Sequence, residues 1–143
     1  MGAVSNIIRA KGDSIFTITP NTTVYNALEI MVEKNVSALL VMDQGQLAGI
    51  FTERDYARKV ILKGKASKDT LIGEIMTRDL ITVSSDTSLE TCMRLMTGKF
   101  IRHLPVVDSG RLAGIISIGD VVKFIIEDQK FIIENMENYI TGK

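Results

Sequence analysis

The chain has 143 residues, 45% of them hydrophobic, and its 17 basic and 17 acidic side chains give a formal net charge of zero. This length suits one domain, or two small subdomains that share a core. The balanced charge argues against partners such as nucleic acid or an anionic membrane. The single cysteine, Cys92, excludes an internal disulfide framework, and no apolar run approaches the ~20 residues that span a bilayer. We therefore expect a soluble, cytoplasmic protein.

The first half of the chain alternates apolar runs with turn residues, which predicts a mixed α+β unit. Gly12, Pro20 and Gly64 mark the ends of elements, and the turn at 43–45 is typical of a hairpin. The elements expected in order are a helix at 4–11, a strand at 15–18, an amphipathic helix from 24, a buried strand at 36–42, a return strand at 47–51 and a helix from 52 to 61.

The second half repeats this order. The expected elements are a strand at 80–83, a helix at 89–96, a strand at 104–107, a return strand at 112–116 and a last helix from about 117 to 140. Pro105 indicates that one end of its strand is unpaired. The topology is β-α-β-β-α, twice. A unit of about 50 residues buries its own elements poorly, so we expect the copies to pack face to face around a pseudo-twofold axis.

These boundaries divide the chain into four segments. We expect an N-terminal helix and leading segment at 1–13, a first motif at 14–64, a linker at 65–78 and a second motif with an extended C-terminal helix at 79–143.

Two heptapeptides hold the most informative side chains. GIFTERD runs from Gly49 to Asp55, and GIISIGD runs from Gly114 to Asp120, 65 positions later. Each is an apolar run, then a hydroxyl residue, then a carboxylate three positions on. This spacing is that of a helix capping box, in which side chains satisfy the first N–H groups of a helix. The residues alone therefore favour a capping role for both motifs.

The duplicated pattern resembles the cystathionine-β-synthase-type (CBS) domain, and the chain resembles a stand-alone tandem CBS pair, or Bateman module. The matching segments are VSALLVMD at 36–43, IRHLPVVD at 101–108, EIMT at 74–77, and the two heptapeptides with their continuations TERDYARKV and SIGDVVK. The resemblance covers roughly residues 4 to 140.

The resemblance implies a non-catalytic regulatory module that binds AMP, ADP, ATP, NAD or a relative in the clefts between the two motifs and signals to a separate partner protein. In the family, the aspartate accepts hydrogen bonds from both ribose hydroxyls, which suits a carboxylate with two acceptor oxygens. The alternative is a ligand-free dimerisation or interaction module. No nucleophile or base is spaced to support an enzyme, so we expect no catalytic residue and no catalytic cofactor. One histidine and one cysteine also argue against a zinc site.

The residues implied to bind ligand form two groups, each drawing on both copies. One group comprises Ser14, Ile15, Phe16, Val36, Ser37, Ile115, Ser117 and Asp120. The other comprises Thr77, Asp79, Leu80, Ile81, Ile101, Arg102, Ile50, Thr52, Arg54 and Asp55.

Phosphate recognition is expected from basic side chains. Arg54, Arg102, His103 and, with weaker support, Lys11 are the candidates, because arginine donates two parallel hydrogen bonds to an anion. His103 could equally be a half-buried structural histidine, and Arg54 a solvated surface charge. Phosphate affinity is expected to favour the Asp55 site unless Asp79 points inward, and the role of Asp79 stays open.

Two further features concern packing. Cys92 lies on an apolar helix face and is expected to be a buried small hydrophobe. The last helix carries an apolar stripe longer than its own unit needs, which predicts a homodimer; the alternative is that it covers the chain's own core. The stripe comprises Val122, Ile125, Ile126, Gln129, Ile133, Met136 and Ile140.

Overall fold

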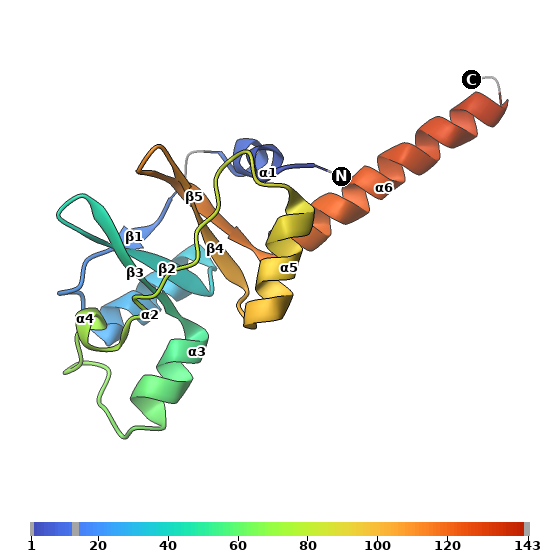
Figure 1. The fold of residues 1–143 in the computed structure, drawn as a ribbon. Helices are drawn as coiled ribbons and strands as arrows, with labels where there is room; N and C mark the ends of the chain where they lie inside the picture. The colour runs from blue at the N-terminus through green and yellow to red at the C-terminus, as the bar shows by residue number, and fades with distance from the viewer. Residues whose placement is uncertain (1, 13–14, 142–143) are drawn as a thin grey trace. The chain divides into compact units, whose positions relative to one another are not determined.

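The computed structural model describes residues 2–12 and 15–141 (Figure 1). The chain divides into two compact units, which do not follow its halves. The repeat-1 unit holds residues 15–81. The repeat-2 unit holds residues 82–143 together with the N-terminal segment 1–14. The fold is mixed α+β, as expected.

The repeat-1 unit contains a three-stranded sheet of order β1-β2-β3, with β1 parallel to β2 and β2 antiparallel to β3. Its core includes Met31, Leu39 and Phe51, to which the short helix α4 adds Ile72 and Ile75. The elements are β1 (Thr17–Ile18), α2 (Val24–Lys34), β2 (Ala38–Asp43), β3 (Gln46–Thr52), α3 (Glu53–Asp55), the π-helix η1 (Tyr56–Ile61) and α4 (Ile72–Ile75).

The repeat-2 unit contains an antiparallel hairpin of β4 and β5 with helices around it. Its buried residues include Val4, Leu89, Leu104 and Ile116, together with Cys92, which is fully buried as predicted. The elements are α1 (Val4–Lys11), α5 (Leu89–Lys99), β4 (His103–Asp108), β5 (Arg111–Ser117) and α6 (Ile118–Thr141).

The duplication is visible in backbone geometry. Both hairpins turn through two residues of positive φ, Gln44-Gly45 and Ser109-Gly110, the arrangement of a type I′ turn. Both carry a register shift at the equivalent place, after Val41 and after Val106. The 65-residue period therefore fixes strand register and turn type as well as element order.

The leading strands differ between the copies. β1 pairs with β2 at two positions, one of which is Thr17 opposite Leu40. The strand expected at 80–83 is reduced to a single parallel bridge between Val83 and Val106, so that expectation was too long. Pro105 stands where the first copy has Leu40, and proline has no N–H to extend the ladder.

The helix expected from Thr52 to Ile61 is also different. It begins with the three-residue α3 and continues as η1, whose wider turns appear where the Leu62 N–H donates to the Ala57 carbonyl. Within this π-helix, Val60 is fully buried. The neighbouring Lys59 side chain turns back toward Asp55.

Each sheet is crossed closely by a further segment of its own unit. In the repeat-2 unit, α1 packs on β5, and a methyl group on Gly114 would lie 2.7 Å from Cδ1 of Ile8. In the repeat-1 unit, the segment after α4 crosses β3, and a methyl group on Gly49 would lie 2.8 Å from the Thr77 carbonyl oxygen. Both glycines of the heptapeptides therefore provide space for a crossing segment.

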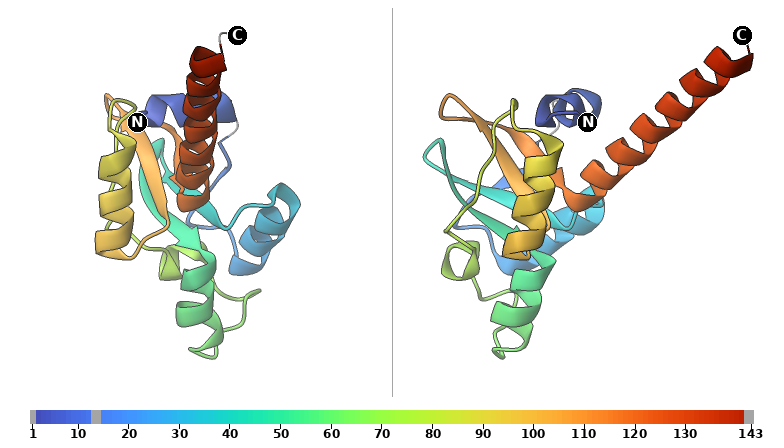
Figure 2. Two further views of the ribbon diagram at one scale, coloured as in Figure 1. Left: turned by 90° about the vertical axis from the view of Figure 1, so that its right-hand side faces the viewer. Right: turned by 45° about the vertical axis from the view of Figure 1, so that its right-hand side comes forward.

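The helix α6 is as long as predicted. Its C-terminal half extends beyond the rest of its own unit (Figures 1 and 2), and it exposes several large apolar side chains, among them Phe131, Met136 and Ile140. Across residues 2–12 and 15–141, none of the helices combines the length and the apolar character that a membrane crossing requires.

Candidate functional site

Both heptapeptides form a capping box where a strand becomes a helix. In the repeat-1 unit, the Asp55 N–H donates to Thr52 Oγ1 at 3.1 Å, and the Thr52 N–H donates to Asp55 Oδ2 at 3.0 Å. In the repeat-2 unit, the Asp120 N–H donates to Ser117 Oγ at 3.1 Å, and the Ser117 N–H donates to Asp120 Oδ2 at 2.9 Å. The capping interpretation is therefore correct for both motifs, and a ligand role would be additional.

The carboxylate of Asp55 is enclosed by donors from its own unit. Besides the Thr52 N–H, Oδ2 accepts from the Thr52 hydroxyl at 3.1 Å, and Oδ1 accepts from the Thr77 hydroxyl at 2.9 Å. The Lys59 ammonium lies 3.1 Å from the same Oδ1. Asp55 is only 7% exposed. These four donors satisfy the hydrogen-bonding needs of this buried carboxylate without a ligand.

Lys59 is the functional residue that the sequence reasoning missed. Its Nζ also donates to the Ile75 carbonyl at 3.1 Å and to Thr77 Oγ1 at 3.2 Å, so it ties α3–η1 to the segment after α4. The signal was its position four residues after Asp55 on a helix, the spacing of an ion pair. Comparison of the repeats hides it, because Phe124 occupies the equivalent position.

Asp120 has a different environment. The Lys11 ammonium, at the end of α1, donates to Oδ2 at 2.9 Å and to the Ile115 carbonyl at 2.8 Å. The Asp120 side chain is 26% exposed. Within the described part of the chain, no donor reaches Oδ1, the second oxygen of this carboxylate. Lys11, which is expected near ligand phosphates, bonds the Asp120 carboxylate in this structure, and its role toward a phosphate stays a prediction.

Charges near Asp120 shift two pKa values. Burial raises the pKa of Asp120, but hydrogen bonds from Ser117 and Lys11 and the charge of Lys11 outweigh it, so the pKa lies below its usual range. Burial lowers the pKa of His103; the Asp120 charge opposes this, while Lys11 and Arg102 lower it further. The net result is a neutral His103 at pH 7 beside two cations and a carboxylate.

The predicted site residues are divided between the two units. The repeat-1 unit holds Ile15, Phe16, Val36, Ser37, Ile50, Thr52, Arg54, Asp55, Thr77, Asp79, Leu80 and Ile81. The repeat-2 unit holds Lys11, Ile101, Arg102, His103, Ile115, Ser117 and Asp120. Ser14 lies outside the described residues.

Parts of both predicted groups come together within a unit. Thr77 pairs with Ile50 through two backbone hydrogen bonds of 3.0 Å and reaches Asp55 with its hydroxyl, as grouped from the sequence. In the repeat-2 unit, His103 lies opposite Ser117 across the β4–β5 hairpin. Each predicted group needs residues of both units, so the full pairing stays a prediction. Asp79 is exposed.

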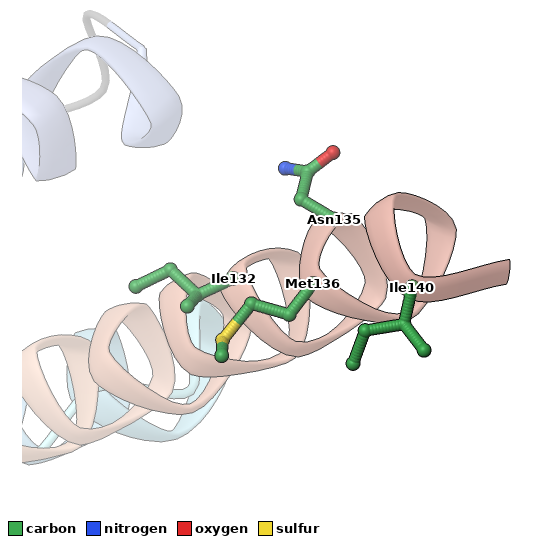
Figure 3. A pocket seen from close by; sticks show the side chains of 4 residues that line it. All are labelled: Ile132, Asn135, Met136 and Ile140. Atoms are coloured by element: carbon green, nitrogen blue, oxygen red, sulfur yellow. The ribbon is translucent and has the colours of Figure 1, made fainter. Parts of the chain in front are cut away.

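Neither the surface hollows nor the arrangement of possible metal ligands indicates a further binding site among the described residues. The hollow in Figure 3 is lined only by Ile132, Asn135, Met136 and Ile140 of α6, so it is a helix surface rather than a ligand cavity. A second hollow lies beside Lys59, with Lys63, Lys65 and Glu74 in its lining. Among the described residues, no cluster of three His, Cys, Asp or Glu side chains could hold a metal ion.

Comparison with known proteins places this geometry in a family. The family model for the CBS domain matches residues 4–62 and 72–127. The CBS domain-containing protein CBSX3, mitochondrial, of Arabidopsis thaliana is 40% identical over 97% of this chain and 72% of its own length.

Solved structures agree. A protein with CBS domains from Burkholderia ambifaria is 50% identical, with a TM-score of 0.86 over 89% of this chain and 96% of its own. The CBS domain pair of protein MJ0100, solved in complex with 5′-methylthioadenosine and S-adenosyl-L-methionine, is 28% identical, with a TM-score of 0.79 over 90% of this chain and 98% of its own. The chain therefore belongs to the CBS-domain family, and it is a CBS pair of the kind that serves as a regulatory module.

Proposed function

We propose that this CBS pair binds an adenosine-containing nucleotide, such as AMP, ADP, ATP or NAD, and signals its presence to a separate partner protein. The observation that carries the proposal is the Asp120 carboxylate, which is held by Ser117 and Lys11 yet offers an oxygen that no described donor reaches. The solved CBS pair of MJ0100, which binds two adenosine derivatives, supports the choice of ligand class.

The chemistry of the motif suits a nucleotide. A carboxylate with an available oxygen accepts hydrogen bonds from the vicinal ribose hydroxyls, which are charge-assisted and stronger than neutral ones. Lys11, Arg102 and Asp120 all lie close enough to His103 to shift its pKa, and the two cations supply positive charge for a phosphate. Ile115, an apolar residue of the predicted groups that belongs to the same unit as Asp120, would contact the adenine.

A nucleotide panel tests the proposal directly. Thermal unfolding is followed with AMP, ADP, ATP, NAD and S-adenosylmethionine, with GMP and inorganic phosphate as controls. A ligand at 100 times its Kd stabilises the folded state by about 2.7 kcal/mol, so the melting temperature rises by several degrees. The proposal fails if no adenosine compound raises the melting temperature at millimolar concentration.

Signalling requires more than binding. A ligand shifts an equilibrium only if its affinity differs between two states of the protein, here two arrangements recognised differently by the partner. Pull-down of the partner from a cell extract with and without the nucleotide found by the panel tests this step. Equal capture of the partner in both conditions would contradict the signalling role, although nucleotide binding would stand.

A homodimer is the second part of the proposal, and the same surface favours the alternative of a ligand-free interaction module. The end of α6 exposes 64% of Phe131, 60% of Met136 and 79% of Ile140, an apolar surface that water disfavours. Sedimentation at micromolar concentration should give a dimer, and Met136→Glu should shift it to monomer, whereas Glu137→Gln should not. A monomeric wild type would contradict the dimer.

We also propose a non-catalytic role in the cytoplasm. Both aspartates serve as capping groups and Asp120 also as a ligand acceptor, so a bound nucleotide should be recovered unchanged after incubation, as measured by chromatography. The relative CBSX3 carries a mitochondrial name. Fractionation of the native source with an antibody against the chain distinguishes the two locations.

A further inference from the structure

The two carboxylate motifs share a backbone but differ in the side chains that fill them. Asp55 accepts from the Thr52 N–H, the Thr52 hydroxyl, the Thr77 hydroxyl and Lys59, and these donors engage both of its oxygens. For Asp120, both the Ser117 N–H and Lys11 reach Oδ2 alone. The chain thus completes one carboxylate internally and leaves the other with acceptor capacity.

We propose that the nucleotide occupies one site per chain, at Asp120, and that Lys59 and Thr77 close the Asp55 motif from within. This inference rests on the proposed function and names which of its two motifs works. It reverses the expectation from sequence that phosphate affinity favours the Asp55 site.

The internal donors of Asp55 are held firmly. Thr77 is fixed by its two backbone hydrogen bonds to Ile50, so its hydroxyl leaves Asp55 only if this bridge opens. Lys59 bonds the Ile75 carbonyl and Thr77 as well as Asp55. A hydroxyl and an ammonium on one buried carboxylate supply the same kind of donors that ribose hydroxyls would, and Asp55 at 7% exposure leaves little room for both.

The second repeat lacks both internal donors. Position 124, equivalent to Lys59, is a phenylalanine, and position 12, equivalent to Thr77, is a glycine without a hydroxyl.

Among the described residues, the side-chain groups that act on the Asp120 carboxylate are Lys11, at the last residue of α1, and more weakly the Ser117 hydroxyl. The Lys11 side chain is 37% exposed, close to the 41% of Lys59, so exposure does not distinguish the two lysines. The partners do distinguish them, because Lys59 bonds Asp55, the Ile75 carbonyl and Thr77, whereas the hydrogen bonds of Lys11 go to Asp120 and the Ile115 carbonyl. Asp120 is also the more exposed carboxylate, so its ion pair is weaker and Lys11 can move to a nearby phosphate.

Calorimetric titration with AMP tests the inference. Wild-type protein should bind one equivalent per chain, and 2′-deoxy-AMP should bind at least tenfold more weakly because it lacks one ribose hydroxyl. Asp120→Asn should weaken AMP binding by tenfold or more. The double variant Asp55→Asn/Lys59→Met removes the buried anion together with its ammonium, and its AMP affinity should stay within about twofold of wild type. Circular dichroism and the melting temperature verify that each variant is folded.

The outcomes separate this inference from the proposed function. Two equivalents of AMP per wild-type chain would overturn the single-site inference and leave the function standing. The same holds if the Asp55→Asn/Lys59→Met protein loses AMP binding while folded, or if Asp120→Asn keeps it. If the wild type binds neither AMP, ATP nor S-adenosylmethionine, the proposed function fails and the single site fails with it. The wild-type stoichiometry decides even if a variant does not fold.

Discussion

The motifs at Asp55 and Asp120 have the same strand register, the same hairpin turn and the same capping box, yet their carboxylates differ in burial and in hydrogen-bond donors. In the repeat-1 unit, Lys59 and Thr77 complete a buried carboxylate. In the repeat-2 unit, Lys11 at the end of α1 bonds a carboxylate that is partly exposed. Duplication preserves the backbone geometry of the motif, whereas a few exchanges of side chains change the burial and the donors of its carboxylate.

The largest expected difference between the motifs is in stability. Asp55→Asn leaves Lys59 beside a neutral amide and removes an anion that four donors serve, so it should cost about 3 kcal/mol in the free energy of unfolding. Asp120→Asn should cost about 1 kcal/mol, because Asp120 and Lys11 are both partly exposed to water. Urea unfolding measures both values. Equal losses in the free energy of unfolding would show that the two carboxylates contribute equally to stability.

Gly49 and Gly114, the equivalent glycines of the two motifs, also have different neighbours. Gly49→Ala would place a methyl group against the Thr77 carbonyl, part of the backbone bridge to Ile50, and should cost about 2 kcal/mol. Gly114→Ala would meet only the flexible end of Ile8 and should cost less than about 1 kcal/mol. Thermal unfolding of the two variants, with Gly98→Ala on α5 as an unobstructed control, gives the order. The reverse order would show that α1 is the more rigid of the crossing segments.

The smallest expected effect is a pH dependence confined to the repeat-2 unit. The pKa of His103 is lowered in the folded state by burial, and by Lys11 and Arg102 against the opposing charge of Asp120, while an unfolded histidine titrates near 6.5. Below about pH 6.5 the unfolded chain therefore binds more protons than the folded one. The contribution of the neutral His103 to the free energy of unfolding is fully present above that pH. It is lost as the pH falls toward the lower pKa of the folded state.

Comparison with His103→Gln isolates this effect. The unfolding midpoint of the wild type should fall more steeply between pH 7.5 and 5 than that of the variant. Asp120 does not interfere, because its pKa is lowered from 3.8 and it stays ionised in both states across this range. Parallel curves for the two proteins would contradict the contribution of His103.

Much of the fold follows from local sequence signals. The 65-residue period predicts the two hairpins, and Gly45 and Gly110 supply the positive φ that their turns need. The capping boxes were predicted as one of two interpretations of the heptapeptides. Pro105 indicated an incomplete strand pairing, although the shortening of the 80–83 strand to one bridge needed the comparison with Leu40.

The side-chain partners of the site follow less readily. Lys11 and Asp120 are 109 positions apart, and no local pattern connects them. The association of α1 with the second repeat depends on tertiary packing, which periodicity does not encode. Lys59 had a local signal in its spacing from Asp55, but it lies outside the duplicated pattern that directed the choice of candidates. Differences between repeats therefore carry as much functional information as their agreement.

The most direct measurement is the crystal structure of the protein with AMP. We expect electron density for one nucleotide per chain, with both ribose hydroxyls at hydrogen-bond distance from the Asp120 carboxylate, and with Lys59 and Thr77 still bonded to Asp55. A ribose bound to Asp55 with Lys59 displaced would contradict the single-site proposal. AMP bound at neither carboxylate, under conditions in which it stabilises the protein, would contradict the role of both motifs.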